Sequence, residues 1–145
     1  FDDKRKKQLA ELSRYMHIAG IGRTEPTLRS ITGNKLTDLF TMHMLQQSAT
    51  GQLVLLTDEH IACRNWPTAR FWQALSSNQH MLMPADVSES LFSLLWTMPE
   101  LIELVTYTKP AEASNKLREF RRDSLYAQHV LHLQQSALET LTHGI

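Results

Sequence analysis

Apolar residues recur at intervals of three and four positions along most of this chain, and that spacing predicts helices. The first apolar stripe consists of Leu9, Leu12, Met16 and Ala19, on a helix expected to end near Gly20. One side of this helix is apolar and the other polar, so it is expected to cover a core.

Two further helices are expected on either side of a glycine. Thr24 can cap the first of them, which runs through Ile31, and Gly33 supplies the left-handed residue that ends it. Asn34 can cap the second helix, which continues to about Gln47. A helix, a tight turn and a second helix form the outline of a helix-turn-helix, in which the second helix can enter a DNA major groove.

The pattern changes after Gly51. Gln52–Leu56 and His60–Arg64 are short extended runs on either side of a polar tip, which is the order of a β-hairpin near residues 52–64. A short buried helix would have the same periodicity, so both interpretations stay open. Another short helix is expected to begin at Asn65 and to run through Leu75.

The C-terminal half has a helical pattern throughout. Asp86 and Glu89 have capping-box spacing, and Pro99 begins the next helical segment. Beyond Pro110, a long amphipathic helix carries a seam that steps by three and four alternately. We expect its apolar residues to form an oligomer or partner interface, with these members: Leu117, Phe120, Leu131, Leu138 and Leu141.

These elements predict a mostly α protein. A length of 145 residues is typical of one domain, so we expect a single domain over residues 1–145. Within it, residues 4–47 would form the part that resembles a helix-turn-helix, and residues 65–145 a helical part that mediates assembly.

Charge is segregated along the chain. The 15 basic and 15 acidic residues cancel overall, yet the segment from Lys4 to Lys35 carries eight basic residues against Glu11 and Glu25, a net charge of +6. The remainder of the chain therefore carries −6. This asymmetry predicts an N-terminal surface that faces a polyanion, although the Lys4–Lys7 run by itself is typical of a solvated helix start.

The sequence contains no recognisable catalytic or metal site. Cys63 is the single cysteine, which excludes an internal disulfide and favours a reducing cytoplasm. His129 and His132 have the spacing of metal ligands but lack a second pair, and no pattern typical of a nucleophile and its base is present. We expect no enzyme activity, no catalytic residues, no metal and no cofactor. No apolar run approaches the length of about 20 residues that spans a bilayer, and we expect no membrane partner. The chain begins at Phe1 without a signal-peptide pattern, so we expect a piece of a longer protein.

The residues around the predicted corner suit DNA phosphates and base edges. Cations and hydroxyl groups at helix starts can contact phosphates, and polar side chains on a second helix can read bases. The candidate DNA-binding residues are Arg23, Thr24, Thr27, Arg29, Asn34, Lys35 and Thr37. A plain structural corner is the alternative, because the second helix carries Lys35 beside Asp38 and is much less basic than recognition helices usually are.

The corner also resembles a known family. Gly22-Arg23-Thr24, followed by Thr27 through Gly33 and then Leu39-Phe40, is similar to the N-terminal corner of the FlhC family, over about 20 of the 145 residues. These are the C subunits of flagellar master activators and of similar regulators on mobile elements. The resemblance implies a bacterial transcription activator that works as a hetero-oligomer on promoter DNA. That family also carries a four-cysteine zinc site, which a chain with Cys63 alone does not reproduce.

Taken together, these patterns predict a non-catalytic bacterial transcription regulator. It would bind DNA through its N-terminal part and oligomerise through its C-terminal part. The alternative is a helical protein–protein interaction module, such as an adaptor, a chaperone or a component of a secretion apparatus, that binds no nucleic acid. A third hypothesis is a sensor domain whose Met and Trp side chains line a pocket for a small ligand.

Overall fold

The computed structural model describes residues 3–21, 29–31, 44, 49–54, 69–85 and 98–143. The chain divides into two compact units, Phe1–Ala49 and Thr50–Ile145, where the sequence predicts one domain. The described residues are mostly helical, as predicted, and a small parallel sheet that was not predicted lies in the second unit.

The first unit contains one described helix and two short strands. Helix α1 spans Asp3–Ser13, and strands β1 (Ala19–Ile21) and β2 (Arg29–Ile31) pair in parallel. The predicted first helix is confirmed, but it ends at Ser13, whose hydroxyl group donates a 2.9 Å hydrogen bond to the Ala10 carbonyl. After Ser13 the Tyr15 and Met16 amides both donate to the Leu12 carbonyl in a turn, and the chain then enters β1, whose Gly20 and Ile21 favour extended structure over helix.

The helix predicted from Thr24 through Ile31 is wrong over Arg29–Ile31, which form β2. The remaining residues of the helix-turn-helix outline, 22–28 and 32–43, lie outside the described part of the chain. The outline as a whole therefore stays a prediction.

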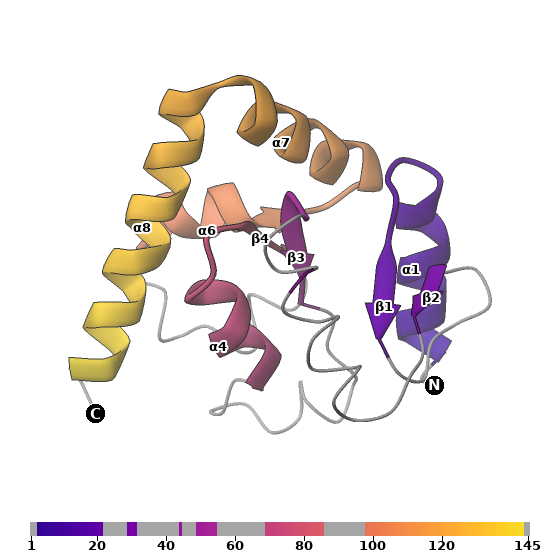
Figure 1. Ribbon diagram of the computed structural model, residues 1–145, viewed down its shortest axis with the longest axis horizontal. Helices are drawn as coiled ribbons and strands as arrows, with labels where there is room; N and C mark the ends of the chain where they lie inside the picture. The colour runs from indigo at the N-terminus through magenta and orange to yellow at the C-terminus, as the bar shows by residue number, and fades with distance from the viewer. Residues whose placement is uncertain are drawn as a thin grey trace. The chain divides into compact units, whose positions relative to one another are not determined.

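The second unit is built on a three-stranded parallel sheet (Figure 1). Its strands, in spatial order, are β3 (Gly51–Leu53), β4 (His80–Pro84) and β5 (Thr106–Tyr107). Parallel neighbours need a crossover, and helices α4 (Ala69–Leu75) and α6 (Pro99–Val105) lie in the two connections. These helices confirm the predicted helical stretches that end at Leu75 and begin at Pro99.

Strand β3 confirms the start of the predicted extended run at Gln52. Its described partner is β4, aligned in parallel with Gln52 opposite Met81, instead of the antiparallel strand of a hairpin. The second run of the predicted hairpin, His60–Arg64, lies outside the described residues.

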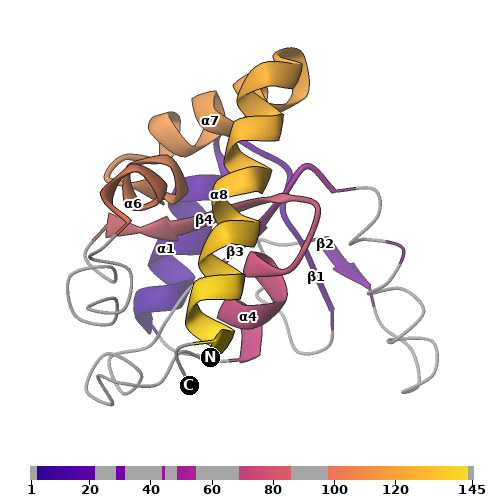
Figure 2. The same cartoon turned by 90° about the vertical axis from the view of Figure 1, so that its left-hand side faces the viewer.

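The long C-terminal helix of the prediction is two helices that meet at a sharp corner (Figures 1 and 2). Helix α7 spans Pro110–Arg122 and α8 spans Ser124–His143. Asp123 separates them, and its Oδ1 accepts hydrogen bonds from the backbone N–H groups of Leu125 at 3.0 Å and Tyr126 at 3.3 Å. This is an N-cap for α8, and it corrects the prediction of one continuous helix.

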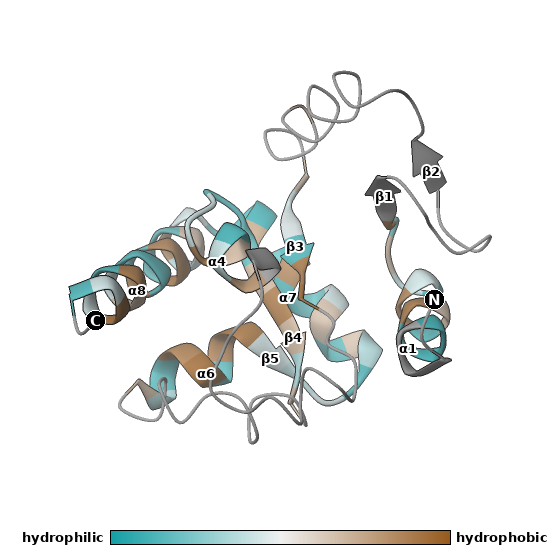
Figure 3. Ribbon diagram, turned by 90° about the horizontal axis from the view of Figure 1, so that it is seen from below, coloured by the Kyte–Doolittle hydropathy of each residue, from teal (hydrophilic) through white to brown (hydrophobic). Residues whose placement is uncertain are grey.

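Helices cover both faces of the sheet, so all five residues of β4 are buried. Figure 3 shows the apolar colouring along β4 and α6. Met81 and Met83 pack in one core with residues of α4, α6 and α8: Phe71, Ala74, Leu75, Leu101, Val105, Ala137 and Leu141. His80 lies on the opposite face, where α7 packs.

Gly51 allows α7 to approach the sheet closely. A Cβ atom built on Gly51 would lie 2.6 Å from Leu117 Cδ2 and 2.8 Å from the His80 carbonyl oxygen. Only glycine fits between strand β4 and helix α7 without a shift of one of them.

Candidate functional site

The structure describes little of the predicted DNA-binding corner. Arg29 lies in β2, and its side chain is outside the described part. The other candidates are outside the described residues altogether: Arg23, Thr24, Thr27, Asn34, Lys35 and Thr37.

Cations of the N-terminal segment are exposed on α1 and just after it. Lys7 and Arg14 are both exposed, whereas Leu9 and Leu12 are buried. At about 100° per residue, Lys7 projects from the side of α1 opposite the two leucines. The first unit therefore presents positive charge to solvent from a helix whose apolar side is covered.

The residues predicted for an oligomer interface are used inside the second unit. Leu141 belongs to its core, the half-buried Leu138 packs against that core, and Phe120 packs against His80 with ring centroids 5.5 Å apart. Leu117 lies over Gly51, and Leu131 is half-buried. The seam covers this chain's own sheet, so its spacing does not require a partner.

A buried histidine, which the sequence analysis missed, joins β4 to both C-terminal helices. The His80 side chain is fully buried, and its Nδ1 lies 2.8 Å from the Met81 carbonyl oxygen. Since a carbonyl oxygen can only accept, Nδ1 carries the proton and Nε2 is left to accept from the Tyr126 hydroxyl group at 2.9 Å.

The surroundings keep both members of this pair uncharged. The pKa of His80 is lowered to about 4, mainly by burial; the Met81 carbonyl opposes this shift and the positive charge of Lys116 contributes to it. Burial, together with the charge of Glu119, raises the pKa of Tyr126 to about 12. Because both ring nitrogens are occupied, this histidine holds α8 to the strand and is not poised for proton transfer.

A second buried polar residue, Gln134, forms hydrogen bonds with the backbone at the start of the same strand. The Gln134 side chain of α8 accepts a hydrogen bond from Met81 N at 2.9 Å and donates one to the Gln79 carbonyl at 2.9 Å. Gln79 in turn accepts from the Gln52 amide at 2.6 Å. Nothing in the helical periodicity distinguishes Gln134 from its neighbours, so the sequence alone does not single it out.

Lys116 is the cation of α7 that points inward. Its ammonium group donates to the carbonyl oxygens of Glu103 at 2.5 Å and Thr106 at 2.6 Å, and lies 3.4 Å from the Glu112 carboxylate. The Glu112 carboxylate also accepts from Thr108 N, and this bond is the main cause of its lowered pKa. Lys116 thus binds the last carbonyls of α6, a typical place for a cation at a helix end.

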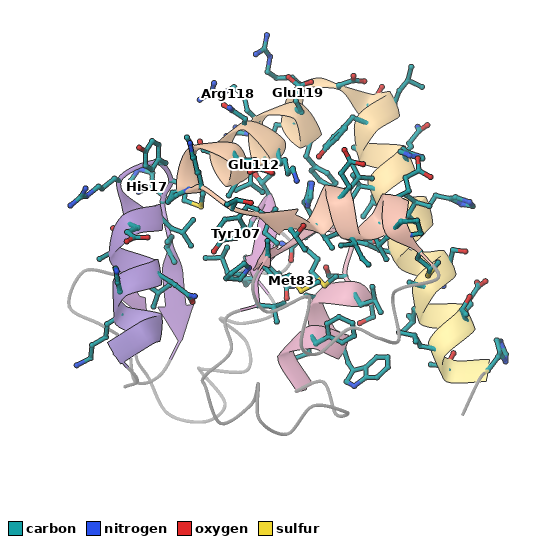
Figure 4. The ribbon with its side chains drawn as sticks, turned by 180° about the vertical axis from the view of Figure 1, so that it is seen from behind. His17, Met83, Tyr107, Glu112, Arg118 and Glu119 are labelled. Carbon is teal, nitrogen blue, oxygen red and sulfur yellow. The ribbon has the colours of Figure 1, made fainter. Side chains whose placement is uncertain are left out.

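The other cations of α7 point outward. Arg118, Arg121 and Arg122 are all exposed, and Figure 4 shows Arg118 on the side of α7 turned away from the sheet. Among the residues that the structure describes, none of these three guanidinium groups forms an ion pair within 4.0 Å. We call these three residues the basic flank of α7.

The described side chains do not form a metal centre. Among them, no three metal-ligating groups come together, and His129 Nε2 lies 2.7 Å from the Glu100 carboxylate, with His132 exposed. Cys63 and His60 lie outside the described residues. In the described part of the chain, no helix has the length and apolar character needed to cross a membrane.

Comparisons with protein-family models, with curated proteins and with solved structures found no match for this chain.

Proposed function

We propose that this chain is a non-catalytic transcription regulator whose N-terminal unit contacts the phosphates of DNA. The observation that carries the proposal is the exposed pair Lys7 and Arg14 in the segment of net charge +6, with Lys7 on the side of α1 opposite its buried leucines. Arginine and lysine contacts to phosphate supply the sequence-independent part of DNA affinity. The resemblance of the neighbouring corner to the FlhC family points to the same class.

Fluorescence anisotropy on a mixed-sequence duplex, repeated across a salt series, tests this function. We expect a dissociation constant of about micromolar order at low salt, and an affinity that falls steeply as salt rises. Replacing Lys7 and Arg14 with Gln should reduce the salt slope by about two, because each phosphate contact contributes about 0.9. The exchange Lys7→Arg with Arg14→Lys keeps both charges and serves as the matched control.

The predicted corner is tested separately with Arg23→Ala, Arg29→Ala and Lys35→Ala combined. If the wild-type chain shows no duplex binding even at low salt, the regulator function is wrong for this chain acting alone. Unchanged affinity in the corner variant would remove the corner from the interface and leave the exposed cations of α1 as its site.

A protein–protein interaction module is the second candidate, and one side chain favours it. Leu125, at the start of α8, is 75% exposed. Interfaces bury apolar side chains at their centre and are enriched in arginine, so an exposed leucine three residues after Arg122 favours a partner surface. Light scattering of the wild-type chain and of Leu125→Ser tests it: a dimer that Leu125→Ser converts to a monomer would support the module. A monomer in both cases removes self-association as its function.

A further inference from the structure

The charges of α7 are separated onto two sides of the helix. At about 100° per residue, the three arginines of the basic flank fall within about 100° of its circumference. The acidic residues Glu112 and Glu119 lie together on the next side, beyond Arg122. Arg118 and Arg122 are about 6 Å apart along the helix axis, so their guanidinium groups can reach neighbouring phosphates.

The fold alone does not account for this arrangement. Arg121 and Arg122 lie in the last turn of α7, where positive charge is favourable to the helix dipole. Arg118 lies outside that turn, and like charges three and four residues apart oppose helix formation. Among the described side chains, Glu119, next to Arg118, forms no ion pair with these arginines within 4.0 Å, and Asp123, next to Arg122, caps α8 through its Oδ1. The three guanidinium groups are therefore held together and left open to solvent.

We propose that the basic flank of α7 is a second phosphate-contacting surface, which binds the backbone of nucleic acid. This inference rests on the proposed DNA-binding function of the N-terminal unit. A guanidinium group binds a phosphate through two parallel hydrogen bonds, and is the side chain that suits phosphate best. Three arginines on one side of a rigid helix contact the backbone without reading sequence, and they add to affinity and salt dependence.

The full-length chain tests the proposal in the same anisotropy assay, with Arg118→Gln, Arg121→Gln and Arg122→Gln combined. Loss of three phosphate contacts should weaken duplex binding by about tenfold or more at low salt and lower the salt slope by about 2.7. The matched control replaces the same three arginines with lysine, which keeps the charge and should keep most of the slope. Circular dichroism verifies that each variant retains its helices.

The outcomes separate this proposal from the function on which it rests. Duplex binding in the wild-type chain with an unchanged slope in the Gln variant overturns the α7 surface and leaves the N-terminal unit as the DNA-binding part. No duplex binding in the wild-type chain overturns both. A poly-glutamate peptide is titrated in parallel: if the Gln variant loses this peptide but retains the duplex, the basic flank binds an acidic protein, and the nucleic-acid assignment is wrong.

Discussion

His80 shows how a single residue can connect several elements of this fold. It starts β4, donates from Nδ1 to the Met81 carbonyl, and accepts from Tyr126 of α8, while Phe120 of α7 packs on its ring. A charged imidazole in this position would lose its acceptor nitrogen and would lack solvent. The second unit is therefore built around the neutral form of His80.

Acid should destabilise the second unit through His80. Its pKa is about 4 in the folded chain against 6.5 for an ordinary histidine, so between these values the unfolded chain binds more protons. The free energy of unfolding is thus highest above pH 6.5 and falls as pH decreases toward 4. From about pH 7.5 to about pH 5 we expect a loss of about 2 kcal/mol from this residue.

Urea unfolding at the two pH values measures this loss. His80→Gln removes the titrating group and should remove about 2 kcal/mol of the pH dependence, whatever its effect on stability at neutral pH. Tyr126→Phe is the control: it removes the hydroxyl group but keeps the burial that is the main cause of the lowered pKa. A pH dependence equal in wild type and His80→Gln would contradict the prediction.

Gly51 is the residue where the close approach of α7 is most easily tested. The Gly51→Ala substitution brings a Cβ within 2.6 Å of Leu117 and 2.8 Å of a backbone oxygen, and the latter cannot rotate away. We expect a loss of about 1–3 kcal/mol in the free energy of unfolding, the usual cost of overpacking. Gln128→Ala on the exposed side of α8 should change it by less than about 0.5 kcal/mol. Equal stability of the two variants would show that α7 can move.

At the scale of elements, a side chain of α8 occupies the hydrogen-bonding positions that a neighbouring strand would otherwise fill beside the start of β4. Strand β5 aligns with Met83 and Pro84 only, so the earlier part of β4 needs other partners on that side. The Gln134 amide supplies them, since it accepts from Met81 N and donates to the Gln79 carbonyl as a neighbouring backbone would.

The Gln134→Leu substitution should therefore lower the free energy of unfolding by more than the change in side-chain volume suggests. It leaves the buried Met81 N–H without its partner, and an unsatisfied group of this kind costs about 1–3 kcal/mol. The Gln79 carbonyl loses its 2.9 Å bond from Gln134 but still accepts from Ser77 Oγ at 3.4 Å. We expect the free energy of unfolding to fall by about 1–3 kcal/mol, and the Met81 amide to exchange its hydrogen faster than in wild type. Gln135→Leu, on the exposed side of the same helix, should change neither quantity by much. Unaltered exchange at Met81 in Gln134→Leu would disprove the role of the amide.

The elements differ in how clearly the sequence predicts them. Helix α6 is predictable because proline marks its first turn, and α4 because its apolar spacing is helical. Strand β4 is not, because a strand buried on both faces shows no alternation and His80–Pro84 is too short to differ from a buried helical run. The apolar spacing continues across Asp123 because α7 and α8 both pack on the sheet. For this reason the sequence predicted one helix where the structure has two.

At the scale of the whole molecule, the candidate sites were only partly predictable. The positive N-terminal segment follows from counting charges, and Lys7 and Arg14 are exposed in the structure. The basic flank of α7 could not be found in this way, because the chain outside Lys4–Lys35 is negative overall and α7 itself carries Glu112 and Glu119 among its cations. It becomes visible only when the structure shows which side of α7 packs on the sheet and that Lys116 points inward.

The two-unit organisation gives the last prediction, on which parts of the chain can be removed. The described core residues of the second unit extend from Val54 to Leu141 in sequence, and Val130, Ala137 and Leu141 of α8 are buried. Deleting residues 113–145 should therefore abolish its cooperative unfolding transition, so such a deletion cannot be used to test for a partner of α8. Residues 50–145 alone should unfold in a single cooperative transition.

Urea unfolding followed by tryptophan fluorescence and by circular dichroism measures both fragments. Coincident transitions for residues 50–145 would establish a unit that folds by itself, because two independent probes then report one event. A fragment 50–145 without a cooperative transition would contradict the division and make the first unit part of the same core. With that fragment, the proposed phosphate contacts of α7 can be tested apart from those proposed for α1, and the salt slope of the fragment can be compared with that of the full chain.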